Sequence, residues 1–148
     1  MKRQVIAFAL SLLIALTAWA AGPARMKIVG IREAPTMREA LQNDVKKICR
    51  LLGVDPVVVK MPGIYWLPDG EAVRQRCNMI SGALEMGELL GLYVPASNRI
   101  YLSKQDYRPY VLWHELAHCI ISHSDLRFTL PEEERKCDWV ADQMERER

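Results

Sequence analysis

Apolar residues in the first half of the chain recur with the period of a helix. Between Met37 and Leu52 they fall at steps of three and four positions, directly after the capping-box pattern Thr36-x-x-Glu39. Gly53 interrupts the pattern, and glycine commonly follows the last residue of a helix. The pattern therefore predicts an N-terminal helix that ends before Gly53.

The middle of the chain carries short apolar segments bounded by turn residues such as Pro62-Gly63 and Pro68-Asp69-Gly70. β-branched or alternating apolar residues fill these segments, which is typical of strands. We expect strands at residues 57–59, 73–80, 83–94 and 99–103. They would form a small, mainly antiparallel sheet.

Two more helices are predicted towards the C-terminus. Residues 109–121 carry an apolar stripe at helical spacing. A second capping box, Thr129-x-x-Glu132, with Pro131 in the first turn, indicates the start of a final helix. With 148 residues, half of them apolar and a quarter charged, the chain suits a single α+β domain over residues 21–148.

Residues 1–20 have the layout of a secretory signal peptide. Lys2 and Arg3 precede an uncharged, mostly apolar run, and Ala18-Trp19-Ala20 fits the small-residue rule for a cleavage site. We expect a mature chain that starts at Ala21, is periplasmic or secreted, and has no stable membrane insertion after cleavage. The alternative is an uncleaved anchor, but a run of 17 residues is at the short end for a spanning helix.

Loss of this leader lowers the net charge. The chain has 20 Lys and Arg against 18 Asp and Glu, so removing Lys2 and Arg3 takes the formal charge from +2 to 0. The basic residues Lys46, Lys47 and Arg50 fall within one predicted helix, where they suit a solvated face. We therefore expect no nucleic-acid binding.

Four cysteines, an even number, are consistent with two disulfides in an exported protein. We favour the pairs Cys49 with Cys77 and Cys119 with Cys137, because each pair lies within one half of the domain. Buried thiols that act as small apolar side chains are the alternative.

The segment His114-Glu115-Leu116-Ala117-His118 matches the HExxH pattern of zinc peptidases. Residues four apart share a helix face, so the two imidazoles can bind one Zn²⁺ ion. Glu115 would take a proton from a water that the ion activates and pass it to the leaving amine. A chance match on an ordinary helix is the alternative, but two of the only three histidines lie in the motif. The motif predicts a zinc metallopeptidase that hydrolyses a peptide or protein substrate.

Glu134 and Asp138 stand four residues apart on the predicted final helix. HExxH followed by ExxxD on a second helix resembles the gluzincin metallopeptidases, and the order of elements resembles the small single-domain minigluzincins. The resemblance implies a zincin-like fold, with Glu134 as the third zinc ligand and Asp138 as the carboxylate that orients a ligating imidazole. It also implies that strand 99–103 is the sheet edge on which a peptide substrate docks. Without a metal, Glu134 would be one charge of the acidic turn 132–134.

Alternatives exist both for how the site is completed and for the function. His123 is a rival third ligand, but it could reach the metal only if the helix ended before it. The group that stabilises the oxyanion would be zinc alone or an upstream tyrosine, namely Tyr101, Tyr107 or Tyr110. One alternative function is a non-catalytic zinc-binding module of the cell envelope that binds a partner protein. Another is a peptidase whose cleft is completed by a partner protein.

Overall fold

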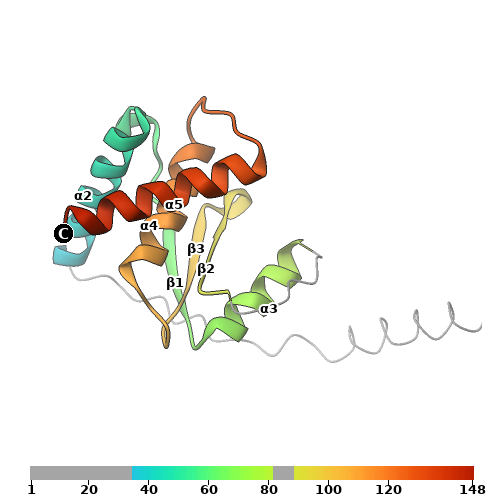
Figure 1. Ribbon diagram of the computed structural model, residues 1–148. Coiled ribbons are helices and arrows are strands. Elements are labelled where there is room, and N and C mark those ends of the chain that lie inside the picture. The colour runs from blue at the N-terminus through green and yellow to red at the C-terminus, as the bar shows by residue number, and fades with distance from the viewer. Residues whose placement is uncertain (1–34, 82–88) are drawn as a thin grey trace, which may run out of the picture.

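The computed structural model describes residues 35–81 and 89–148, which form a mixed α+β fold (Figure 1). The elements are, in order, α2 (Pro35–Leu52), η1 (Pro56–Val58), β1 (Gly63–Leu67), α3 (Gly70–Ser81), β2 (Gly91–Val94), η2 (Pro95–Ser97), β3 (Arg99–Ser103), α4 (Pro109–Ser122) and α5 (Leu130–Arg146). The described part thus has four α-helices and one small sheet, which confirms the α+β class. The predicted signal peptide lies outside the described residues.

The sheet has three strands in the order β1-β3-β2. β1 runs parallel to β3 with Tyr65 opposite Tyr101, whereas β2 is antiparallel to β3 with Leu92 opposite Tyr101. The prediction of a mainly antiparallel sheet is therefore wrong, since one pairing is of each kind. The prediction that strand 99–103 forms an edge is also wrong, because β3 is the central strand and β2 is an edge.

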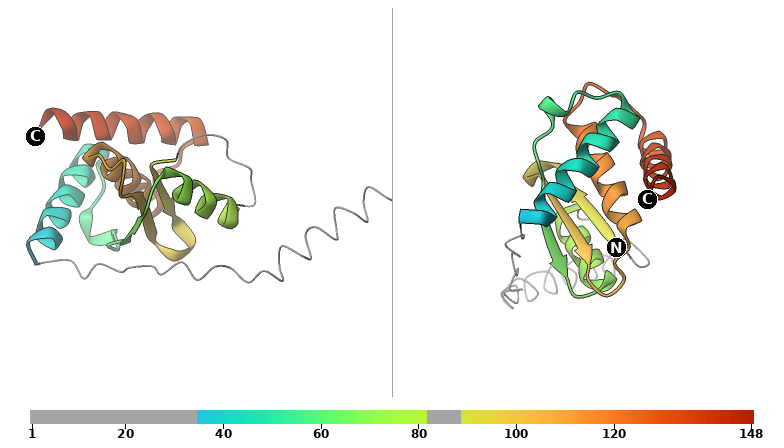
Figure 2. Two further views of the ribbon diagram at one scale, coloured as in Figure 1. Left: turned by 90° about the horizontal axis from the view of Figure 1, so that it is seen from below. Right: turned by 90° about the vertical axis from the view of Figure 1, so that its left-hand side faces the viewer.

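Both faces of the sheet are covered (Figures 1 and 2). Ile100 and Leu102 of β3 point into the main core, which α2, α4 and α5 close on one side. Tyr101, between them, points to the opposite face and joins Leu67 and Val73 in a second cluster under α3. This alternation along β3 follows from the pleat of a strand, and it separates the α3 side from the side of the HExxH helix.

The predicted helices at both ends of the chain are confirmed as α2, α4 and α5. Such helices can be predicted from the sequence because one face packs into the core and so carries apolar residues at helical spacing. Ile48 of α2 and Leu116 of α4, for example, are fully buried. The side chain of Thr36, the first predicted cap, lies outside the described side chains. In the described part of the chain, no helix is long and apolar enough to cross a membrane.

Two predicted strands are wrong. Residues 57–59 lie largely in the short helix η1, because the Asp55 side chain accepts the Val57 N–H at 2.9 Å and Val57 projects into solvent. Residues 73–80 lie in α3, which Asp69 caps by accepting the Ala72 N–H at 2.9 Å. The sequence pattern alone places Asp69 in a turn, and the structure shows that this turn starts the helix.

Two further differences concern the strands that remain. β1 was not predicted; it is apolar on both faces and shows no alternation. Within the predicted strand 83–94, the described strand is β2, Gly91–Val94, and residues 82–88 lie outside the described residues.

Neither predicted disulfide is present among the described residues, which include all four cysteines. Cys49 lies in the main core on α2, whereas Cys77 lies on α3 across the sheet. Cys119 lies on α4 with its sulfur 3.5 Å from the Oδ1 atom of Asn98, the residue before β3, and Cys137 is fully buried on α5. The three buried thiols therefore serve as small core side chains.

Candidate metal centre

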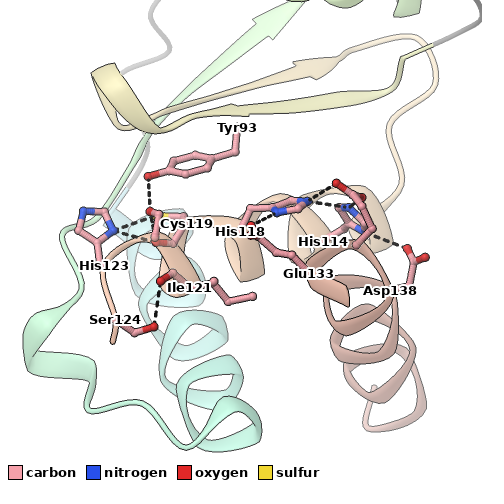
Figure 3. A network of polar contacts seen from close by, with 11 residues as sticks. Tyr93, His114, His118, Cys119, Ile121, His123, Ser124, Glu133 and Asp138 are labelled. Carbon is pink, nitrogen blue, oxygen red and sulfur yellow. Dashed lines mark hydrogen bonds and ion pairs between the residues drawn. The ribbon is translucent and has the colours of Figure 1, made fainter. Parts of the chain in front are cut away.

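Two adjacent helices supply the candidate ligands. α4 carries His114 and His118 one turn apart, and α5 packs against α4 with the acidic residues of its first turns facing them (Figure 3). The start of α5 is set by its capping box, in which Glu132 Oε2 accepts the Thr129 backbone N–H at 2.8 Å. This cap, predicted from the sequence, places Glu134 in the turn that reaches α4.

His114, His118 and Glu134 form a group that could hold a metal ion, with one ligand atom of each lying within 4.8 Å of the others. The two Nε2 atoms are 3.1 Å apart. Glu134 Oε2 lies 3.3 Å from His114 Nε2, and Oε1 lies 3.4 Å from His118 Nε2. Two ligands of a tetrahedral ion bound at about 2.0 to 2.1 Å would be about 3.3 to 3.4 Å apart. The three side chains therefore already have the spacing of such a coordination shell.

A carboxylate holds the far nitrogen of each imidazole. Asp138 Oδ1 lies 2.9 Å from His114 Nδ1, as the ExxxD pattern implied. Glu133 Oε1 lies 2.7 Å from His118 Nδ1 (Figure 3), a contact that the sequence interpretation missed. Because a carboxylate oxygen accepts, each Nδ1 donates, and a neutral imidazole in that tautomer keeps its lone pair on Nε2.

With both imidazoles neutral, this arrangement brings three electron-pair donors together. The two Nε2 lone pairs and the Glu134 carboxylate repel one another unless a proton or a cation lies among them. Glu133 and Asp138 add negative charge next to both imidazoles. The electrostatics of the group therefore favour a cation, and a divalent cation most.

Glu115 is buried beside this group. Burial is the main cause that raises its pKa to about 7; nearby His118 and a backbone hydrogen bond from Tyr93 lower it, and Glu134 raises it. A carboxyl whose pKa lies near neutrality can both take and return a proton at physiological pH. This is the property that a general base at such a site requires.

Gly91, at the start of β2, makes room for Glu115. A Cβ atom at this position would lie 2.8 Å from Glu115 Oε1 and 2.6 Å from Val111 Cγ1. Only glycine lets the strand approach the helix so closely, which is a known use of glycine within a strand. The isolated glycine between apolar residues was a signal for such an approach.

His123 is not part of the group. It is the C-cap residue of α4, and its Nδ1 atom donates to the Cys119 backbone oxygen at 2.8 Å (Figure 3). Of the rival third ligands, the structure therefore brings Glu134 and not His123 to the two imidazoles. Burial also raises the pKa of the Cys119 thiol to about 11 and raises that of Cys137 strongly, so neither thiol offers a thiolate that would compete for a metal.

The three tyrosines expected near the oxyanion lie elsewhere. Tyr101 faces the second core, where its hydroxyl accepts from Arg76 at 3.0 Å. Tyr107 packs edge-on against Trp66 at 4.8 Å between ring centroids. Tyr110 is the nearest to the site, and its hydroxyl donates to Asp138 Oδ1 at 3.2 Å. Tyr110 therefore supports the carboxylate that holds His114, and does not line the cavity beside the ligands.

A cavity of about 320 Å³ opens next to the three candidate ligands. One wall is α4 with His114, Glu115 and His118; the other is the edge strand β2 and its continuation to Pro95. A small molecule or a segment of peptide could therefore reach the ligand atoms.

Comparisons of the chain with family models, with curated proteins and with solved structures gave no match. The class of protein is thus defined by the fold and the site alone: a small α+β protein whose adjacent helices bring two histidines and a glutamate together in a group that could hold a metal ion.

Proposed function

We propose that this protein is an exported zinc-dependent peptidase of the gluzincin type. The observation that carries the proposal is the convergence of His114 Nε2, His118 Nε2 and the Glu134 carboxylate, with Glu115 buried beside them. A helix bearing HExxH and a second helix bearing ExxxD are both present, in the order that the resemblance implies. A zincin-like fold is part of the proposal.

Zinc suits this set of donors. Two neutral imidazoles and one carboxylate are a common protein ligand set for zinc in catalytic sites, where three protein ligands leave a position open. A structural zinc site would instead be closed by four protein ligands. When bound, zinc would supply Lewis acidity, which lowers the pKa of a water and polarises a substrate carbonyl.

Glu115 is the general base in this proposal. It would take a proton from the attacking water and return it to the leaving amine, so one carboxyl serves as base and then as acid. Tyr93 and Gly91 hold it in place: the first by a backbone hydrogen bond, the second by the space it leaves. Asp138 and Glu133 keep the two imidazoles in the tautomer that presents Nε2.

The substrate would dock on β2, the edge strand that borders the cavity, in place of β3. The Ser103 N–H donates to the Leu90 carbonyl at 2.9 Å, so Leu90 and every second residue after it, Leu92 and Val94, face β3 with their backbone groups. By that alternation Gly91 and the Tyr93 carbonyl face away from β3, towards the open edge, whereas the Tyr93 N–H already donates to Glu115. An extended peptide can add to such an edge through backbone hydrogen bonds.

The decisive experiment compares zinc content and peptide hydrolysis in the parent, Glu115→Gln and Glu134→Ala. Parent protein purified without chelators should hold one zinc and cleave peptides. Glu115→Gln should keep the zinc and lose hydrolysis, because only the base is removed; Glu134→Ala should lose most of the zinc. If Glu134→Ala binds zinc as tightly as the parent, the gluzincin assignment is wrong. Zinc in the parent without hydrolysis of any peptide would favour a zinc-binding envelope module that binds a partner protein.

A further inference from the structure

Tyr93, in the edge strand β2, contacts the helix α4 at two points. Its backbone N–H donates to the Glu115 carboxylate in the middle of the helix, and its hydroxyl lies 2.8 Å from Ser122 Oγ in the last turn. Figure 3 shows its side chain pointing towards the turn of α4 that carries Cys119. Ser122 follows Glu115 by seven residues, which is about two turns and about 10 Å along one face of the helix. Two contacts on one face fix both the position and the tilt of Tyr93 relative to α4.

Both partners of the Tyr93 hydroxyl are themselves held in place. Ser122 Oγ also donates to the Cys119 carbonyl at 2.8 Å. Asn98 accepts from the Tyr93 hydroxyl through Oδ1 at 3.2 Å, while its Nδ2 donates to two backbone carbonyls of the loop before β1, at 3.2 and 3.3 Å. Burial raises the pKa of Tyr93 to about 12, so the hydroxyl keeps its proton and remains a donor. Because its hydroxyl already has two partners within the protein, Tyr93 holds the strand and does not need a substrate group.

The distance between β2 and α4 is not set by the sheet. β2 is an edge strand of four residues, and its hydrogen bonds to β3 fix it within the sheet only. Its separation from α4, which packs on the face of the sheet, depends on the side chains between the two. Gly91 permits the close approach at Glu115, and the Tyr93 hydroxyl joins the strand to the helix.

We propose that the Tyr93 hydroxyl is a positioning group for the general base: by joining β2 to the last turn of α4, it keeps the Tyr93 N–H on the Glu115 carboxylate. The inference rests on the proposed peptidase function, and it adds a residue that acts through Glu115 rather than on the substrate. A base displaced by about 1 Å can cost about 100-fold in rate. Loss of the hydroxyl should therefore reduce turnover and leave the metal ligands in place.

Two variants remove the contact from opposite sides. Tyr93→Phe deletes the hydroxyl and keeps the ring that packs in the main core. Ser122→Ala deletes the partner oxygen on an exposed residue, so the core is untouched. If both variants act through this one contact, the double variant should be no slower than the slower single variant.

Two further variants serve as comparisons. Ser124→Ala is the matched control for Ser122→Ala, because Ser124 Oγ likewise donates to a helix carbonyl, that of Ile121 at 2.9 Å, and its described hydrogen bonds lie within residues 121–126. Tyr110→Phe also removes a tyrosine hydroxyl, but one that supports Asp138 beside His114. It should therefore act on the metal and not on the base.

The first readout is catalysis by the zinc-loaded mature chain, on the peptide that the parent cleaves fastest in a quenched fluorescent library. Zinc affinity is measured in parallel by competition with a chelator. In Tyr93→Phe and Ser122→Ala, kcat should fall by about tenfold or more while zinc affinity stays as in the parent. Tyr110→Phe should instead weaken zinc binding, and Ser124→Ala should change neither quantity.

The second readout needs no turnover. Hydrogen exchange of the backbone amide of residue 93, measured by NMR, reports whether its hydrogen bond to Glu115 is kept. Exchange at residue 93 should be faster in Tyr93→Phe and Ser122→Ala than in the parent, relative to the amides of the central strand β3. In Ser124→Ala it should be unchanged.

Unchanged exchange at residue 93 in both variants would overturn the positioning role, even if peptides are cleaved. So would a kcat equal to that of the parent, or a loss of zinc from Tyr93→Phe, since the hydroxyl would then support the whole site and not the base. By contrast, faster exchange in a protein that cleaves no peptide would support the positioning of Glu115 and overturn the peptidase function. The two failures are therefore distinguishable.

Discussion

Replacing Gly91 by alanine is predicted to destabilise the protein, because the added methyl group has no space. The built Cβ atom would lie 2.6 Å from Val111 Cγ1, 2.8 Å from Glu115 Oε1 and 2.9 Å from Glu115 Cγ. Favourable separations between carbon atoms are about 3.5 to 4.0 Å, so the overlap with Val111 alone is about 1 Å. Glu115 Cγ is not the free end of a side chain, so relief requires a shift of the buried carboxylate or of the strand.

The sign of the change in stability distinguishes overpacking at position 91 from the alternative, in which there is open space for a methyl group. Among the described residues, Gly53 is the glycine with positive φ, so alanine at position 91 meets no backbone strain. With open space around it, Gly→Ala would stabilise the protein by about 0.4 to 1 kcal/mol through the unfolded state. Overpacking instead costs about 1 to 3 kcal/mol. At about 2 to 4 °C per kcal/mol for a chain of this size, Tm should fall by several degrees.

The measurement is urea unfolding of the metal-free parent and variants. Val111→Ala should recover part of the loss in the double variant with Gly91→Ala, giving a coupling energy of about 1 kcal/mol. Gly53→Ala is the control, since its cost of about 1 kcal/mol comes from its φ of 69° and should not couple to Val111→Ala. A Gly91→Ala variant as stable as the parent, or more stable, would refute the close approach.

The same substitution should separate catalysis from metal binding. The atoms nearest to a Cβ at position 91 belong to Val111 and Glu115 rather than to an imidazole, so zinc content should be unchanged. A displacement of the base by about 1 Å can cost about 100-fold in rate. Loss of zinc from Gly91→Ala would show that the strand positions the ligands and not the base alone.

Three other predictions follow from the site and the core. Asp138→Asn and Glu133→Gln should each weaken zinc binding by about 10- to 100-fold, measured by competition with a chromophoric chelator, because each removes a carboxylate that holds an imidazole; an effect of Asp138→Asn alone would show that the Glu133 contact is incidental. Zinc should raise Tm by mass action, and Glu134→Ala should abolish the rise; a rise of equal size in the variant would exclude Glu134 as a ligand. All four cysteines should react with a thiol reagent in denaturant, and in the native protein the half-buried Cys77 should react well before the other three, which are fully buried; fewer than four thiols in denaturant would mean that a disulfide forms.

Local patterns predicted the parts of the molecule that depend on local geometry. The helical period identified α2, α4 and α5, and the four-residue spacings of His114 with His118 and Glu134 with Asp138 indicated which side chains share a face. Those relations hold within one helix whatever surrounds it. That the two pairs face each other could be inferred only from the resemblance, because the packing of α4 against α5 is a tertiary contact.

The errors and omissions have a tertiary cause. Residues 73–80 alternate loosely in sequence, but they form the helix α3, whose first turn is capped by Asp69. Of the apolar residues of α3, only Val73 is fully buried, so the segment has no clear apolar face that would indicate a helix. β3 is central because β1, a strand apolar on both faces, pairs with its other side. Glu133 acquires its role from a neighbour on another element, so no spacing along the chain indicates it; an isolated glycine such as Gly91 signals a close approach but not the residue it approaches.

The three candidate ligands lie within 21 consecutive residues, from His114 to Glu134, on two helices that are neighbours in sequence. Bringing them together requires closure of only one short loop, which is fast and carries a small entropic cost. Glu115 instead acquires its buried environment from Gly91 and Tyr93, which must first pair with β3. If the proposed metal binds, we therefore expect the α4–α5 hairpin to bind it before the sheet is complete. The ability to hydrolyse a peptide would then arise later and separately, once β2 has paired with β3 and Glu115 is buried.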